Sequence, residues 1–299
     1  MENIRMKAYA KINLTLDVLG KRPDGYHELS SVMQSIGLCD TLLMSKTPRQ
    51  GIEIKTDCLE LPVDEGNLVY RAAQCLLSAY KVQQGVFIEL QKRIPIAAGL
   101  AGGSSDCAAT LLGLNKLFEL NIPQKRLFEI GRQLGADVPF CLMANEAGSP
   151  TTALAEGVGE QLTPLPSHPE AWIVLAHLPI MVSTKTIFSR WINNAASSAK
   201  STDMVNAFAT GNINEVASSL SNALAPVAMA LHPKIDALMM ALSAQNAIGV
   251  NMTGSGPTVF AYFFTETTAL RAIEYIKQQF PDCDFFNMKV ELKQKEERM

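Results

Sequence analysis

The fold is decided by residues 95–106, which read Pro95-Ile-Ala-Ala-Gly99-Leu-Ala-Gly102-Gly103-Ser104-Ser105-Asp106. A segment with β-strand character, Val86–Leu90, precedes this stretch, and a segment with helical periodicity, Ser105–Leu120, follows it. Glycines let the backbone approach a ligand closely, and the start of a helix presents N–H groups and a positive dipole end. The stretch therefore predicts an anion site, most naturally for phosphate. Ser104 and Ser105 add hydroxyl donors or a magnesium ligand.

Two common nucleotide-binding motifs do not fit this loop. No lysine follows the glycines as it does in GxxxxGK[ST], and Gly99, Gly102 and Gly103 lack the GxGxxG spacing. The simpler alternative is an ordinary helix start, capped by Ser104 or Ser105 after a tight turn. That alternative accounts for one serine and one glycine, whereas phosphate binding accounts for three glycines and the serine pair.

Composition sets the broad class of protein. The 299 residues are 47% hydrophobic, enough for one large domain or two ordinary ones. The 26 basic and 29 acidic residues give a net charge of −3, so no basic excess indicates a nucleic-acid partner. No apolar run has the length of a membrane span, and Met1–Lys11 does not resemble a signal peptide. We expect a cytoplasmic protein without a membrane partner, either a monomer or a weak homodimer.

Cysteines and histidines indicate no dedicated metal site. The six cysteines form no CxxC pair and are irregularly spaced, so we expect reduced thiols in the core. The four histidines show neither HxxxH nor HExxH spacing. A metal, if one acts here, should arrive with a ligand, as Mg²⁺ does with phosphates.

The first half of the chain predicts mixed α and β structure. Strands are expected at Thr41–Ser45 and Ile52–Thr56, and Asn67–Tyr80 has the pattern of a helix capped by Asn67. Another helix is expected from Pro123 to Leu134, with Gly135 as a left-handed stop.

Gly157–Pro169 is rich in Gly, Pro, Ser and Thr, which indicates a seam between domains. We expect domains at 1–163 and 164–292, followed by a charged tail, 293–299. Beyond the seam the elements follow the order β-α-β-β-α-β, which suits a ferredoxin-like domain. Their expected ranges are Trp172–His177, Pro233–Asn246, Gly249–Thr253, Thr258–Phe264, Thr267–Phe280 and Asn287–Leu292.

Several polar residues stand where apolar ones would be expected. Lys11 and Asn13 share one face of an otherwise apolar strand, and that face would suit phosphate and substrate charge. The alternative for Lys11 is an ordinary exposed lysine. Asp137 lies in an apolar context, either as a capping or turn aspartate or as the acceptor of a proton from a hydroxyl nucleophile.

Two further turns have a structural and a functional interpretation. Tyr26 and His27 follow a turn, and they form either ordinary hairpin surface or a stacking platform for a nucleobase. The loop Thr253–Thr258 joins two strands either as a plain hairpin with a bulge or as a second backbone wall facing the phosphates.

Taken in order, Lys11 in an N-terminal strand, the Pro95–Ser105 loop opening a helix, and the late loop Thr253–Thr258 resemble the GHMP small-molecule kinases. The resemblance implies an α+β fold of two lobes, an N-terminal mixed α/β lobe and a C-terminal ferredoxin-like lobe. It implies ATP-dependent phosphorylation of a hydroxyl group on a small molecule, with Mg²⁺ delivered by ATP.

The resemblance also implies roles by position. Asp137 would be the general base and Lys11 its ion-pair partner. Tyr26, His27 and, on the opposite face, Phe188 would recognise a cytosine, while Asn13 would contact the acceptor. The ATP phosphates would be wrapped by Pro95, Ile96, Ala97, Ala98, Gly99, Leu100, Ala101, Gly102, Gly103, Ser104 and Ser105, and the second glycine loop comprises Gly254, Ser255 and Gly256.

The chain departs from the family pattern at two places. Ser149-Pro150 stands where a glycine pair is expected, and the residues after Asn222 lack the usual acidic and aromatic side chains, so no role is assigned there. Two alternatives stay open. One is another GHMP kinase of the mevalonate-pathway or homoserine type, in which Tyr26 and His27 would have no base to bind. The other is a non-catalytic nucleotide-binding module, which would be expected to lose Lys11 or Asp137.

Overall fold

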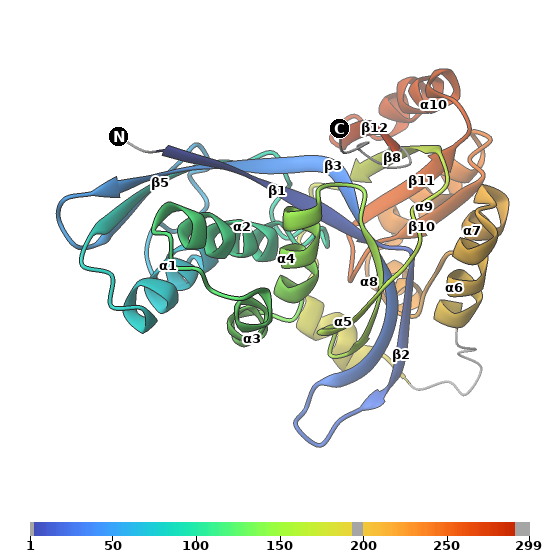
Figure 1. Ribbon diagram of the computed structural model, residues 1–299. Coiled ribbons are helices and arrows are strands. Elements are labelled where there is room, and N and C mark those ends of the chain that lie inside the picture. The colour runs from blue at the N-terminus through green and yellow to red at the C-terminus, as the bar shows by residue number, and fades with distance from the viewer. Residues whose placement is uncertain (1–2, 193–199, 291–299) are drawn as a thin grey trace, which may run out of the picture. The chain divides into compact units, whose positions relative to one another are not determined.

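The computed structural model describes residues 3–192 and 200–290 (Figure 1). Their contacts separate into two compact units. The first unit comprises residues 3–11, 38–96 and 101–149; the second comprises 12–37, 97–100, 150–192 and 200–290. Both units are discontinuous in sequence, and the boundaries 1–163 and 164–292 stay predictions. The expected tail, 293–299, lies outside the described residues.

The first unit combines strands with four helices. The last part of β3 (His27–Thr47) pairs antiparallel with β5 (Gly85–Gln91), and β4 (Ile52–Thr56) pairs parallel with β5. β1 (Asn3–Asn13) also pairs with β3. The helices are α1 (Leu68–Ala79), α2 (Gly102–Leu117), α3 (Gln124–Leu134) and α4 (Val138–Ala147). Helix α2 contacts the other three, and its buried face joins the apolar core of this unit.

The second unit begins with a sheet around the first part of β3. β2 (Thr15–Lys21) and β6 (Thr152–Gly157) both pair antiparallel with β3. β7 (Gln161–Pro164) extends β6, and β9 (Ser221–Asn222) pairs parallel with β2. Part of the stretch expected to be a seam is therefore the strand β7.

The remainder of the second unit has the ferredoxin-like arrangement. Its antiparallel sheet has the strand order β10-β11-β8-β12, and helices α9 and α10 contact it. The elements are β8 (Ala171–His177), α9 (Pro233–Ser243), β10 (Gly249–Met252), β11 (Thr258–Phe263), α10 (Glu266–Gln279) and β12 (Asp284–Val290). Between β8 and α9 the described residues form four inserted helices: α5 (Thr184–Arg190), α6 (Lys200–Thr210), α7 (Ile213–Ser218) and α8 (Ala225–Leu231). This order confirms the predicted β-α-β-β-α-β pattern.

Helix α2 starts earlier than its periodicity predicts. Ala101 adopts a left-handed conformation with φ 56° and occupies the N-cap, so the helix begins at Gly102 and neither serine caps it. The simpler alternative of a serine-capped helix start is thus wrong. The prediction for Gly135 is wrong too, because this residue ends α3 with extended backbone (φ 177°) rather than a left-handed turn.

Two elements exceed what the sequence pattern indicated. β3 runs over 21 residues where only Thr41–Ser45 was expected. Helix α4 was not expected, because its residues are apolar nearly all round and show no amphipathic period. Asn67 caps α1 as predicted, through a hydrogen bond from the N–H of Val69.

Within residues 3–192 and 200–290, no helix combines the length and apolar character that crossing a membrane requires. The six cysteines are free; Cys107, Cys141 and Cys283 are buried, and the other three are half-buried.

Candidate active site

The loop Pro95–Ser105, called the phosphate loop after its predicted role, has an unusual backbone. Ala97, Gly99 and Ala101 take positive φ angles of 54°, 75° and 56°, at every second residue. A left-handed conformation costs an alanine about 1–2 kcal/mol, so surrounding interactions must maintain it here. Left-handed residues in a turn are the setting in which successive N–H groups form anion-binding concavities.

The start of α2 supplies the next donors. The first hydrogen bond of the helix runs from the N–H of Ser105 to the carbonyl of Ala101, at 2.9 Å. The N–H groups of Gly102, Gly103 and Ser104 therefore precede the helical ladder and point out of its positive end. These donors suit a phosphate group.

The two serines at the start of α2 have different surroundings. Ser105 is fully buried; its hydroxyl lies 3.3 Å from Oδ1 of Asn145, and its carbonyl accepts from Nδ2 of Asn145 at 3.0 Å. Its N–H is used in the helix. Of the predicted pair of hydroxyl donors, Ser104, which is half-buried, is left to face a ligand.

Within the second unit, Gly99 packs directly on the second glycine loop. A Cβ atom on Gly99 would lie 2.6 Å from the carbonyl oxygen of Thr253 and 3.2 Å from that of Gly256. Gly254, at φ +57°, would bring a Cβ to 3.2 Å from the carbonyl oxygen of Gly99. Backbone lies against backbone, so only glycine fits at either position.

Two buried asparagines secure the second glycine loop. Asn13 accepts from the N–H of Gly254 at 3.1 Å, and its own N–H donates to Oγ1 of Thr253 at 3.0 Å. Asn222 donates through Nδ2 to the carbonyls of Met252 and Gly254, at 2.7 and 2.8 Å. Ser255 meets Thr184 of α5, with their hydroxyl oxygens 2.8 Å apart.

Lys11 and Asp137 form an ion pair within the first unit. Nζ of Lys11, on β1, lies 3.8 Å from Oδ1 of Asp137. The lysine side chain is 6% exposed, which excludes the alternative of an ordinary surface lysine, and the aspartate side chain is 33% exposed. Asp137 occupies the N-cap of α4, yet its carboxylate makes no capping hydrogen bond. This carboxylate thus faces a buried ammonium group on one side and solvent on the other.

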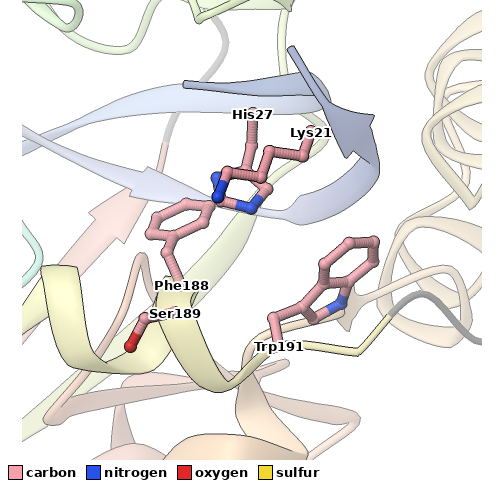
Figure 2. A pocket seen from close by; sticks show the side chains of 5 residues that line it. All are labelled: Lys21, His27, Phe188, Ser189 and Trp191. Carbon is pink, nitrogen blue, oxygen red and sulfur yellow. The ribbon is translucent and has the colours of Figure 1, made fainter. Parts of the chain in front are cut away.

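The nucleobase candidates gather in a pocket of the second unit (Figure 2). Its volume is about 350 Å³, and it is lined by Lys21, His27, Phe188, Ser189 and Trp191. The rings of His27 and Phe188 have centroids 5.0 Å apart with a tilt of 34°, and Trp191 meets His27 edge-on at 5.9 Å. Figure 2 shows His27 extending from the strand toward the helix that carries Phe188.

His27 is poised to hydrogen-bond rather than to carry charge. Burial lowers the pKa of His27, and the nearby ammonium of Lys21 lowers it further. At neutral pH the ring then has one donor and one acceptor nitrogen, a pair that can read the edge of a base.

Tyr26 and Asn13, the other two residues predicted to bind the substrate, do not line this pocket. Tyr26 is 65% exposed and does not line the described pocket. Asn13 is only 1% exposed, and its side chain takes part in the contacts with Gly254 and with Ser31, to which Nδ2 donates at 2.8 Å.

Sequence reasoning missed three contributors. Trp191 directly follows the helix that carries Phe188. Residues three apart at a helix lie on the same face, so the spacing of Trp191 from Phe188 was the available signal that both rings face one pocket. Lys21 ends the strand before the Tyr26 turn. Asn222, to which no role was assigned, gave no local signal because its partners lie about 30 residues further along the chain.

Comparisons with known proteins identify the family of the chain. The GHMP kinases N terminal domain family matches residues 67–145, and the GHMP kinases C terminal family matches residues 204–282. The 4-diphosphocytidyl-2-C-methyl-D-erythritol kinase of Lachnospira eligens is 44% identical, covering 93% of this chain and 95% of that protein. The enzyme of the same name from Acetivibrio thermocellus is 42% identical, covering 95% and 98%.

Solved structures give the same result. A crystal structure of 4-(cytidine 5'-diphospho)-2C-methyl-D-erythritol kinase superposes with a TM-score of 0.80 at 32% identity, covering 96% of this chain and 98% of that one. A homoserine kinase from Cytophaga hutchinsonii reaches a TM-score of 0.78 at 18% identity, a likeness of fold alone.

The chain belongs to the GHMP kinases, and it is an ATP-dependent small-molecule kinase with the two-lobed α+β fold of that family. Within the family it groups with the 4-diphosphocytidyl-2-C-methyl-D-erythritol kinases, which it matches over nearly its whole length.

Proposed function

We propose that the protein transfers the γ-phosphoryl group of ATP to the 2-hydroxyl of 4-diphosphocytidyl-2-C-methyl-D-erythritol. The products are the 2-phosphate and ADP, and the reaction belongs to the non-mevalonate synthesis of isoprenoid precursors. The observation that carries the proposal is the ion pair of buried Lys11 with Asp137, a carboxylate that caps no helix and is partly open to solvent.

Asp137 acts as the general base. A carboxylate oxygen of Asp137 accepts the proton of the substrate 2-hydroxyl. At the same time the hydroxyl oxygen forms a bond to the γ-phosphorus, and the bond between the γ-phosphorus and the β–γ bridging oxygen breaks. Lys11 orients the carboxylate, and its positive charge offsets charge that develops on the transferring group. Proton acceptance by a positioned side chain contributes roughly 10²–10⁴-fold.

The phosphate loop positions ATP. The N–H groups of Gly102, Gly103 and Ser104 and the positive-φ backbone before them are proposed to bind the phosphates. No cluster of three or more His, Cys, Asp or Glu side chains suited to a metal occurs among residues 3–192 and 200–290. Mg²⁺ bound mainly by phosphate oxygens and water needs only one or two protein ligands, and the Ser104 hydroxyl fits that requirement. When bound, the ion would neutralise phosphate charge.

The aromatic pocket favours a cytidine-bearing acceptor over the other substrates of the family. Phe188 and Trp191 supply stacking surface, and neutral His27 supplies a donor and an acceptor for a base edge. Tyr26 remains a proposed stacking partner from its exposed turn, and Asn13 a proposed contact of the acceptor. Mevalonate and homoserine carry no base, so they have no use for such a pocket.

An acceptor panel tests the proposal. Purified enzyme with ATP and Mg²⁺ is assayed for ADP release with the cytidylyl substrate, mevalonate and homoserine in separate reactions. We expect turnover with the cytidylyl substrate at a kcat/KM at least a hundredfold above the other two. Faster turnover of mevalonate or homoserine would favour the rival kinase, and binding of ATP without turnover of any acceptor would favour a non-catalytic module.

A further inference from the structure

A buried cluster of three charged residues lies in the first unit, apart from Lys11 and Asp137. Lys92 follows β5, Asp40 is on β3, and Asp106 is on the second turn of α2. Nζ of Lys92 lies 2.5 Å from Oδ2 of Asp40 and 2.7 Å from Oδ2 of Asp106. Their side chains are 9%, 0% and 4% exposed. Burying three charges is costly, so a function is expected to offset the cost.

The cluster joins the two ends of the phosphate loop. Oδ1 of Asp40 accepts from the N–H groups of Arg93 and Ile94, at 2.5 and 2.9 Å, which secures the chain just before Pro95. Asp106 comes directly after Ser105, the last residue of the loop. Lys92, in the segment that enters the loop, therefore pairs with Asp106 in the helix that leaves it, and Asp40 contacts both Lys92 and the chain before Pro95.

Lys92 of this cluster also lies close to the first residue of α2. A Cβ atom on Gly102 would lie 3.1 Å from Cγ2 of Ile94 and 3.4 Å from Nζ of Lys92. The first residue of the helix thus packs on the lysine, and its N–H belongs to the donors proposed for phosphate. Displacing the lysine would release the helix start that presents those donors.

We propose that Lys92, Asp40 and Asp106 are positioning residues that hold the base of the phosphate loop closed, so that ATP meets donors already in place. The inference rests on the proposed role of this loop in binding ATP. Without the cluster, the loop ends would have to be ordered when ATP binds, and that ordering lowers affinity.

The protonation of Asp106 shapes the choice of variants. Oδ1 of Asp106 is buried and has no hydrogen-bond partner among the described residues. Burial raises the pKa of Asp106 to about 7; Lys92 opposes this rise, and the Asp40 carboxylate adds to it. An asparagine resembles the protonated carboxyl and keeps an oxygen for Lys92. Alanine keeps the helix but removes the link to Lys92.

The test compares Asp106→Ala with Asp106→Asn. The dissociation constant of a non-hydrolysable ATP analogue is measured by calorimetry, and KM is measured for ATP and for the cytidylyl acceptor. We expect Asp106→Ala to weaken analogue binding and raise the KM for ATP about tenfold, with the acceptor KM within twofold of wild type. Asp106→Asn should stay within threefold of wild type in every constant. Arg126→Met, which removes an exposed ion pair with Glu129, is the control and should change none of them.

The outcomes separate the inference from its rivals. Removing a negative charge near the phosphates would by itself tighten ATP binding, so equal tightening in Ala and Asn would overturn the inference. An equal rise of both KM values in Asp106→Ala would indicate a merely structural role and would overturn it too. If Asp106→Ala does not fold, Asp40→Asn is used instead, because it turns an amide donor toward Lys92. This variant must weaken binding of the ATP analogue about tenfold, or the inference fails.

Binding of the analogue does not require the acceptor. A wild-type enzyme that does not phosphorylate the cytidylyl substrate would therefore refute the proposed function and leave this binding test intact.

Discussion

Replacing Gly99 by alanine tests whether the phosphate loop depends on the close approach of two backbones. The new Cβ would meet the carbonyl oxygens of Thr253 and Gly256, at 2.6 and 3.2 Å, and neither is the movable end of a side chain. The left-handed conformation costs alanine about 1–2 kcal/mol. The forced displacement adds about 1–3 kcal/mol, as overpacking does elsewhere. We therefore expect Gly99→Ala to lose about 2–5 kcal/mol of unfolding free energy.

Gly211→Ala is the matched control for Gly99→Ala. Gly211 also has a positive φ, +67°, but a Cβ there would have nothing within 4 Å, so only the conformational cost of about 1–2 kcal/mol applies. Urea unfolding measures both losses, and steady-state kinetics measures the KM for ATP. We expect that KM to rise about tenfold in Gly99→Ala, equivalent to about 1.4 kcal/mol, and to stay unchanged in Gly211→Ala. Equal stabilities and equal KM values in the two variants would refute the reasoning.

Three further changes probe the remaining parts of the site. Phe188→Ala should raise the acceptor KM about tenfold to a hundredfold, because stacking worth about 1–3 kcal/mol is lost, while the KM for ATP should stay within twofold of wild type. Equal effects on the KM values of both substrates would contradict the stacking role. Because the pKa of His27 is lowered, its ring stays neutral when the pH falls to the ordinary pKa of a histidine, and affinity for the acceptor should decline only below that pH. In Lys21→Met the decline should begin at higher pH, because the nearby ammonium no longer lowers the pKa of His27. Identical profiles of acceptor KM against pH in the two enzymes would contradict this. Asn222→Asp replaces a donor to two buried carbonyls by an acceptor, so urea unfolding should show a loss of about 2–4 kcal/mol of unfolding free energy. Steady-state kinetics should show a higher KM for ATP, and unchanged stability with an unchanged KM would show that Asn222 does not secure the loop.

The place of the glycine loop before a helix was predictable because its signal is local. Glycines that precede a helical pattern predict a phosphate loop, and the order of elements after residue 171 predicts the ferredoxin-like sheet, which the strand order confirms. The start of α2 was not predictable in detail, because it depends on Ala101 adopting a conformation that alanine ordinarily avoids.

Contacts between distant segments were beyond the sequence patterns. Lys11 and Asp137 each stood out as polar residues in apolar surroundings, but no spacing rule brings together residues so far apart in the chain, so their pairing followed from the resemblance. The residues that follow Asn222 indicate no role, although the side chain of Asn222 secures a loop elsewhere in the chain. Lys92 and Asp106 flank the phosphate loop in sequence, and that position was the overlooked signal of their ion pair.

The central claim is that Asp137 takes the proton of the acceptor hydroxyl. Asp137→Asn keeps the size of the side chain and its place at the start of α4 but removes the basic oxygen. The decisive measurement is the single-turnover rate of phosphoryl transfer to the cytidylyl substrate, with ATP-analogue affinity measured on the same protein. We predict a rate lowered roughly 10²–10⁴-fold with analogue affinity equal to or tighter than that of wild type. A rate within threefold of wild type would contradict the account.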